Sequence, residues 1–172
     1  MAAELKSTEE GPGSLEGDVV RLMSENNLTL CTAESCTGGM LGARIVNVPG
    51  ASDVFKAGFV TYSNKAKRKF LNVKKKTLKV HGAVSEKTAK EMAKGAMKAA
   101  GTDAAVSTTG IAGPGGGTPE KPVGLVYICA VVGKRVCVKE CRFSGSRSEI
   151  RQSTVETALT MLRTAVMDEV QG

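Results

Sequence analysis

The sequence predicts a single α/β domain in which helices cover both faces of a mixed sheet. The chain has 172 residues, which is an ordinary size for one domain. Apolar runs typical of buried strands alternate with segments whose apolar residues recur at helical spacing. Two late strand-like runs flank Gly133-Lys134, which indicates an antiparallel hairpin. We therefore expect a three-layer α/β/α sandwich with a mixed sheet.

Capping residues, glycines and prolines set the expected limits of the helices. Ser14, Asn64, Ser85 and Ser146 each precede such a helical run and are expected to cap it. The expected helices cover 14–25, 40–48, 64–71, 85–100 and 146–166. The expected strands cover 28–33, 59–62, 104–108, 123–132 and 135–143. Lys74-Lys75-Lys76 is expected to form a surface turn.

Composition places the chain among globular proteins of a reducing compartment. Residues 1–13 are expected to be a flexible acidic leader before a domain at 14–172, and no run is apolar and long enough to span a membrane. No secretory signal precedes the domain, so we expect a cytoplasmic protein. The five cysteines are odd in number and lack Cys-x-x-Cys spacing. The chain has only one histidine. The cysteine spacing and the lack of further histidines both argue against a zinc site.

The positive charge is concentrated in one stretch of the chain. The net charge is +7, whereas residues 56–98 alone hold thirteen Lys or Arg and two Glu, a balance of +11. Such a segment suits nucleic acid or a phosphorylated small molecule, although solvated helix faces explain it equally well. Aromatic residues make up only 3% of the chain, which argues against a stacking platform for single-stranded nucleic acid.

Ser35 is the first candidate for chemistry, because it lies between a predicted strand and a predicted helix. The residues after it, Cys36, Thr37, Gly38 and Gly39, bring backbone N–H groups to a helix start, where they can hold an oxyanion or a phosphate. The alternative is that Ser35 and Thr37 only cap the helix. Sequence spacing leaves both interpretations open.

A serine nucleophile needs a base, and Lys67 with Tyr62 is the best candidate. Both lie just after a predicted strand and so at the same sheet edge as Ser35, whereas His81 has no evident link to it. As a base, Lys67 needs a lowered pKa. Packing beside Phe59 and Phe70 is one expected cause, and repulsion from the neighbouring cations Lys65, Arg68 and Lys69 is the other. The alternative is a solvated lysine.

A glycine-rich loop at 109–122 is the second candidate site. It lacks the Gly-Lys-Ser/Thr of a phosphate-binding P-loop, and it leads into a strand rather than a helix. Its backbone N–H groups are expected to bind an anion, together with Arg147 in the first turn of the last helix. A flexible surface loop is the alternative. The glycines concerned are Gly110, Gly113, Gly115, Gly116 and Gly117.

Five segments make the chain resemble the C-terminal domain family of CinA, the competence/damage-inducible protein A. They are Ala33–Gly39, Gly58–Lys67, His81–Ser85, Thr109–Gly124 and Phe143–Arg147. The resemblance implies hydrolysis of the carboxamide of nicotinamide mononucleotide to nicotinate mononucleotide and ammonia. It implies Ser35 as nucleophile with Tyr62 and Lys67 as partners, no metal or other cofactor, and a homo-oligomer, often a dimer.

The chain also departs from the family pattern. Many members carry a further N-terminal domain similar to molybdopterin-binding domains, for which 172 residues leave no room. The leader and Lys74–Lys76 fall outside the family motifs. Two other functions remain open: a non-catalytic nucleotide-binding module, and a DNA-associated accessory protein.

Overall fold

The computed structural model describes residues 13–171. The expected leader at 1–13 lies outside these residues apart from Gly13. The helices are α1 (Leu15–Glu25), α2 (Met40–Val46), α3 (Asn64–Leu71), α4 (Lys75–His81), α5 (Glu86–Ala100) and α6 (Arg147–Gln171), with a short 3₁₀ helix at Ala51–Asp53. The strands are β1 (Leu30–Glu34), β2 (Phe55–Val60), β3 (Ala104–Gly110), β4 (Leu125–Val132) and β5 (Arg135–Arg142).

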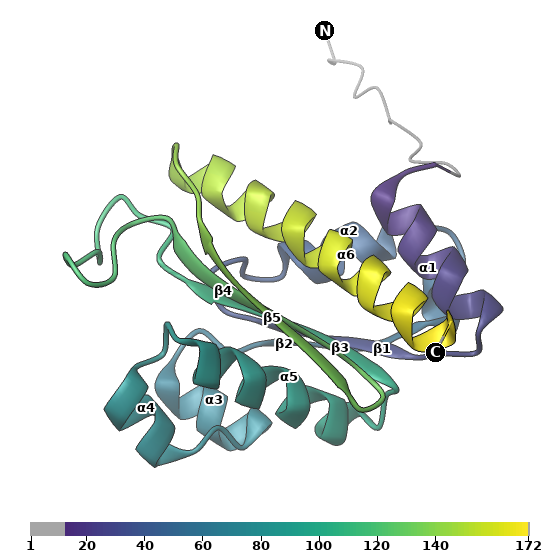
Figure 1. The fold of residues 1–172 in the computed structure, drawn as a ribbon, viewed down its shortest axis with the longest axis horizontal. Helices are drawn as coiled ribbons and strands as arrows, with labels where there is room; N and C mark the ends of the chain where they lie inside the picture. The colour runs from purple at the N-terminus through teal and green to yellow at the C-terminus, as the bar shows by residue number, and fades with distance from the viewer. Residues whose placement is uncertain (1–12, 172) are drawn as a thin grey trace, which may run out of the picture.

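A five-stranded mixed sheet forms the middle layer, with the strand order β2-β1-β3-β4-β5. β1 pairs in parallel with both β2 and β3, and the β4–β5 hairpin continues the sheet antiparallel to β3. Helices cover both faces of this sheet, with α1, α2 and α6 on one side and α3, α4 and α5 on the other (Figure 1). The predicted fold class is confirmed.

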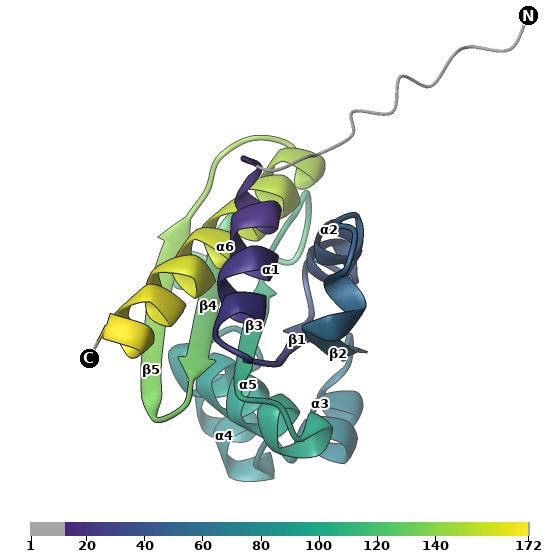
Figure 2. The ribbon, with the colours of Figure 1, turned by 90° about the vertical axis from the view of Figure 1, so that its right-hand side faces the viewer.

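Two hydrophobic cores lie on the two faces of the sheet, because successive strand residues point to opposite sides. Leu30 and Val106 face the layer of α1, α2 and α6, whereas Cys31 and Ala105 face α5. The turned view separates the layers clearly, with β2 at one edge of the sheet and β5 at the other (Figure 2). The edge position of β2 explains its half-exposed pattern.

The expected caps bound three of the helices. Ser14 and Ser85 accept backbone N–H bonds from the first turns of α1 and α5. Ser146 and Glu149 exchange bonds at the start of α6, where the Glu149 carboxylate accepts from the Ser146 N–H at 2.7 Å. This reciprocal pair is the capping box that the sequence predicts.

Three local predictions were wrong. The strand expected at 59–62 is β2 at Phe55–Val60, because Lys56 and Gly58 interrupt its apolar pattern. β2 pairs with β1 from Phe55 to Val60, with an irregularity at Lys56. The cap of α3 is Ser63, which accepts from the Ala66 N–H, and not Asn64. Lys74–Lys76 is no turn, because Lys75 starts α4 and the apolar side chains of that helix pack against α5.

Two helix glycines should respond in opposite ways to alanine. At Gly95 in α5 a Cβ would overlap the backbone carbonyl of Leu71, whereas at Gly42 in α2 it meets only ordinary contacts of 3.4 Å or more. Gly95→Ala should therefore destabilise the protein by about 1–3 kcal/mol despite the helix preference of alanine. Gly42→Ala should be neutral or stabilise by up to about 1 kcal/mol. Urea denaturation measures both, and a stabilised Gly95→Ala would contradict the close α3–α5 approach.

Candidate active site

One buried carboxylate shapes the loop that carries Ser35. Glu34 ends β1 with an exposed fraction of 1%, and its two oxygens point at the start of α2. They accept the Thr37 hydroxyl at 2.7 Å and the backbone N–H groups of Gly39, Leu41 and Gly42 at 2.9, 3.1 and 2.9 Å. A carboxylate is well placed there, because the free N–H groups and the dipole of a helix start favour negative charge. Glu34 therefore folds residues 35–39 into a compact loop.

Four further hydrogen bonds hold this loop in place. The Ser35 N–H donates to the Thr108 carbonyl at 3.0 Å, which continues the pairing of β1 with β3. From α6, Arg151 donates to the carbonyls of Cys36 and Thr37 at 3.1 and 2.7 Å. The hydroxyls of Thr37 and Thr108 lie 2.7 Å apart. Ser35 thus sits on a loop fixed from the sheet and from two helices.

Lys67 reaches Ser35 from α3, the helix that follows β2. Its side chain is 1% exposed, and its Nζ donates to the Thr61 carbonyl at 2.6 Å and to Ser35 Oγ at 2.9 Å. β2 pairs in parallel with β1, so the residues after both strands meet at one sheet edge. The structure therefore brings Ser35 and Lys67 into direct contact across 32 positions of sequence.

Burial lowers the pKa of Lys67 from 10.5 to about 8, because the site penalises the charged ammonium. The only opposing influence is the nearby Cys36 thiol, which raises this pKa. The expected lowering is present, but the expected repulsion from neighbouring cations contributes nothing. Phe70, which was expected to bury the amine, is 52% exposed. A substantial fraction of Lys67 is therefore neutral near physiological pH.

Cys36 is a poor competitor to Ser35 as a nucleophile. The side chain is buried, and this burial raises the pKa of its thiol to about 11. The reactive species of a cysteine is the thiolate, which is scarce several pH units below the pKa. Ser35, with a lysine amine at hydrogen-bond distance, is the activated group of the pair.

Tyr62 lies at the same edge but contacts a different partner from the one expected. Its hydroxyl accepts from Arg147 at 2.8 Å, and the other terminal nitrogen of Arg147 donates to the Gly113 carbonyl at 2.7 Å. The Tyr62 side chain is 63% exposed and bonds to neither Ser35 nor Lys67. Lys67 contacts Ser35 directly, so proton transfer between them needs no relay through Tyr62.

The glycines expected to bind a ligand divide into two groups. At Gly110, Gly113 and Gly117 a Cβ would collide with β4 or with Val123. Glycine is therefore needed at these positions so that the chain can pack closely. Gly115 and Gly116 border open space and remain available to a ligand. In the Ser35 loop, the N–H groups of Gly38 and Gly39 already donate to Ser35 and Glu34. Those of Cys36 and Thr37 donate to no other residue in the described chain.

His81 is not part of this arrangement. It ends α4, and its backbone carbonyl accepts from Lys121, which also bonds the Val84 carbonyl. Within residues 13–171 no group of three or more His, Cys, Asp or Glu side chains is arranged to hold a metal ion, and no helix is long and apolar enough to cross a membrane.

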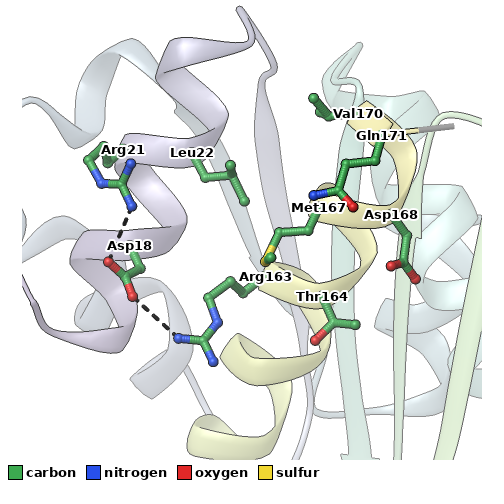
Figure 3. A pocket seen from close by; sticks show the side chains of 9 residues that line it. All are labelled: Asp18, Arg21, Leu22, Arg163, Thr164, Met167, Asp168, Val170 and Gln171. Carbon is green, nitrogen blue, oxygen red and sulfur yellow. Dashed lines mark hydrogen bonds and ion pairs between the residues drawn. The ribbon is translucent and has the colours of Figure 1, made fainter.

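A separate hollow of about 600 Å³ lies between α1 and the last turns of α6 (Figure 3). Its charged groups are largely satisfied by each other, because Asp18 pairs with Arg21 at 3.5 Å and with Arg163 at 3.3 Å. It contains no nucleophile with a partner base. This hollow therefore offers no second candidate active site.

The geometry agrees with the family that the sequence resembles. Residues 13–166 match the model of the CinA C-terminal domain. The chain belongs to the CinA C-terminal domain family. It is 54% identical over 157 residues to a CinA-like protein of Kosmotoga olearia, covering 91% of this chain and 38% of that protein. A competence-damage inducible protein of Clostridium novyi is 53% identical over 90% of this chain and 37% of its own length. The chain thus spans less than two fifths of these curated relatives.

Solved CinA structures have the same fold. The competence/damage inducible protein CihA of Agrobacterium tumefaciens matches with a TM-score of 0.84 and 45% identity, over 90% of this chain and 96% of that one. A CinA superfamily protein of Klebsiella pneumoniae matches with a TM-score of 0.86 and 34% identity, again over 90% and 96%. The match covers nearly the whole of both solved chains.

Sequence reasoning overlooked two residues that shape the candidate site. Glu34 lies inside the motif around Ser35, but nothing in the sequence indicates that it turns toward α2. Arg151 follows Arg147 by four positions, a spacing that places both guanidinium groups on one face of α6. That spacing is a usable signal, since the two arginines bond Gly113 and the Ser35 loop respectively.

The buried amine should destabilise the fold in a pH-dependent way. Folded Lys67 releases its proton at about 8 and the unfolded chain at 10.5, so below pH 8 its burial costs about 3 kcal/mol. Lys67→Met should therefore be more stable than the wild type at pH 7. Between pH 8 and 10.5 the unfolded chain binds more protons, so wild-type stability rises with pH and the difference shrinks. Urea denaturation across this pH range measures the difference in free energy of unfolding between Lys67→Met and the wild type. A difference that does not change with pH would mean that Lys67 has an ordinary lysine pKa.

Proposed function

We propose that this CinA-family protein is a hydrolase that converts nicotinamide mononucleotide to nicotinate mononucleotide and ammonia. The identity of the amide rests on the resemblance of the sequence motifs to this family. The observation that carries the hydrolase proposal is the contact of Ser35 with a buried lysine whose pKa is lowered to about 8.

The first half of the proposed reaction forms an acyl-enzyme. Neutral Lys67 accepts the Ser35 hydroxyl proton while Oγ attacks the carboxamide carbon. The resulting oxyanion is held by the N–H groups of Cys36 and Thr37, whose places in the loop Arg151 and Glu34 determine. The carbon–nitrogen bond then breaks, and the Lys67 ammonium gives its proton to the departing nitrogen, which leaves as ammonia.

The second half of the reaction releases the acid. Lys67, neutral again, accepts a proton from water, and the water oxygen attacks the acyl carbon. The ester bond to Ser35 breaks, and the proton returns from Lys67 to Ser35 Oγ. Thr61 holds the lysine amine throughout, because its carbonyl accepts an N–H from Nζ in both protonation states. Overall, one amide and one water are consumed, and one carboxylic acid and one ammonia are formed.

Cations on one face of α6 support a phosphorylated substrate. Arg147 bonds Tyr62 and Gly113, and Gly113 belongs to the same loop as Gly115 and Gly116, which border open space. A guanidinium that keeps free N–H donors suits a phosphate group. A non-catalytic nucleotide-binding module would use the same rim but would give no role to the Ser35–Lys67 contact. The cytoplasmic location and the homo-oligomer implied by the resemblance stay predictions.

Ammonia release from nicotinamide mononucleotide tests the proposal directly. Ser35→Ala should lose several orders of magnitude in kcat, because no nucleophile remains. In the wild type, kcat/KM should rise with pH through an apparent pKa of about 8, where the amine becomes neutral. Lys67→Arg should be nearly inactive at every pH, since a guanidinium keeps its proton.

Two neighbouring variants serve as controls for this test. Cys36→Ala and Lys65→Ala should retain activity, because neither side chain bonds Ser35 Oγ, whose donor is Lys67. Near-wild-type ammonia release by Ser35→Ala would overturn the serine mechanism. An unchanged pH profile in Lys67→Ala would remove the lysine from its role as base.

Arg147 should distinguish the phosphorylated substrate from its parent nucleoside. Arg147→Ala should raise KM for nicotinamide mononucleotide roughly 10- to 100-fold, as expected for one charge-assisted contact. The same change should hardly affect nicotinamide riboside, which lacks only the phosphate. Arg142→Ala, which removes an exposed arginine paired with Glu140 on β5, is the matched control. An equal rise in KM for both substrates would mean that Arg147 does not bind the phosphate.

A further inference from the structure

A basic surface covers the outer side of α4 and α5. We define it by six lysines, namely Lys74, Lys76, Lys87, Lys90, Lys94 and Lys98. Two neighbouring hollows lie along it, of about 550 and 470 Å³, and they share Lys74, Glu91 and Lys94 in their walls. The opposite side of α5 is apolar and packs on the sheet. The basic surface therefore faces away from the core.

The carboxylates of this surface leave most of its lysines uncompensated. Glu91 points at α4, where it accepts the Lys74 N–H at 2.8 Å and the Thr77 hydroxyl at 2.7 Å. Glu86 pairs with Lys90 one helical turn away. Six lysines and these two glutamates leave a formal charge of +4. Lys87, Lys94 and Lys98 are exposed, and none of the three forms an ion pair within residues 13–171.

The length of the basic surface indicates the shape of its ligand. Lys87, Lys90, Lys94 and Lys98 follow one another at helical spacing on α5, over about 16 Å at 1.5 Å per residue. A small phosphorylated molecule would occupy one of the two hollows and leave the other empty. A linear chain of phosphates would lie along both.

We propose that the basic surface binds double-stranded nucleic acid through its phosphate backbone, without reading the base sequence. Lysine suits phosphate as a point charge, and several lysines in a row match a repeating phosphate. A single strand would require a row of aromatic side chains for base stacking, but Phe70 and His81 are the only aromatic rings lining the two hollows, one in each. This function is separate from the proposed hydrolase, because none of the six lysines bonds Ser35 or Lys67.

Fluorescence anisotropy of a labelled DNA duplex tests the proposal through its salt dependence. If about four phosphates are neutralised, log K should fall against log[salt] with a slope of about −3 to −4. Affinity should then drop about 100-fold between roughly 50 and 200 mM salt. Lys87→Gln/Lys94→Gln should bind about tenfold or more weakly at low salt, with a slope less steep by about 2.

A matched variant separates this surface from general positive charge. Lys134→Gln/Lys139→Gln removes two exposed lysines from the β4–β5 hairpin and should leave duplex affinity and slope unchanged. Thermal unfolding of both variants should match the wild type, since all four side chains are exposed. Equal losses in the two variants would overturn the assignment to α4 and α5. So would tighter binding of the single strand, or equal competition by tripolyphosphate at the same phosphate concentration.

Discussion

The candidate site depends on the buried carboxylate of Glu34. β1 must end in the middle of the sheet, and α2 must begin only a few residues later, so several backbone N–H groups at the start of α2 need an acceptor. Gly39, the residue at the cap position, has no side chain to supply one. Glu34 accepts from three of these N–H groups and from Thr37, and so replaces the missing cap from the end of the strand. Ser35 follows Glu34 directly, so the contacts that start the helix also fix the position of the nucleophile.

A second constraint is the burial of the amine opposite Ser35. An ammonium group prefers water, and enclosing Lys67 between the end of β2 and the Ser35 loop lowers its pKa by making the charged form unfavourable. The same burial that weakens the fold at neutral pH supplies the unprotonated amine that a base requires. The Thr61 carbonyl limits the cost, since it gives Nζ a hydrogen-bond partner inside the protein. Stability and reactivity are therefore opposed at this one side chain.

Two sets of cations in the protein differ in geometry. Arg147 and Arg151 lie one helical turn apart on α6, and their planar groups bond carbonyls at the rim of the site and in the Ser35 loop. The lysines of α4 and α5 belong to the other helical layer and are mostly exposed, and they bond few protein groups. Arginine suits fixed, two-pronged contacts, whereas lysine on a flexible stem suits a solvated surface and a repeating anion.

The sequence alone determined the fold class, most helix limits and the candidates Ser35 and Lys67, because these depend on local periodicity, capping residues and a family motif. The capping box at Ser146 and the left-handed Gly101 at the end of α5 are local in this sense. Only the tertiary structure decided which groups meet. It joined Ser35 to Lys67, turned Tyr62 toward Arg147, and gave Gly110 a packing role against β4. It also made burial the cause of the lowered Lys67 pKa. These outcomes depend on strand order and on burial by distant segments, which spacing along the chain does not encode.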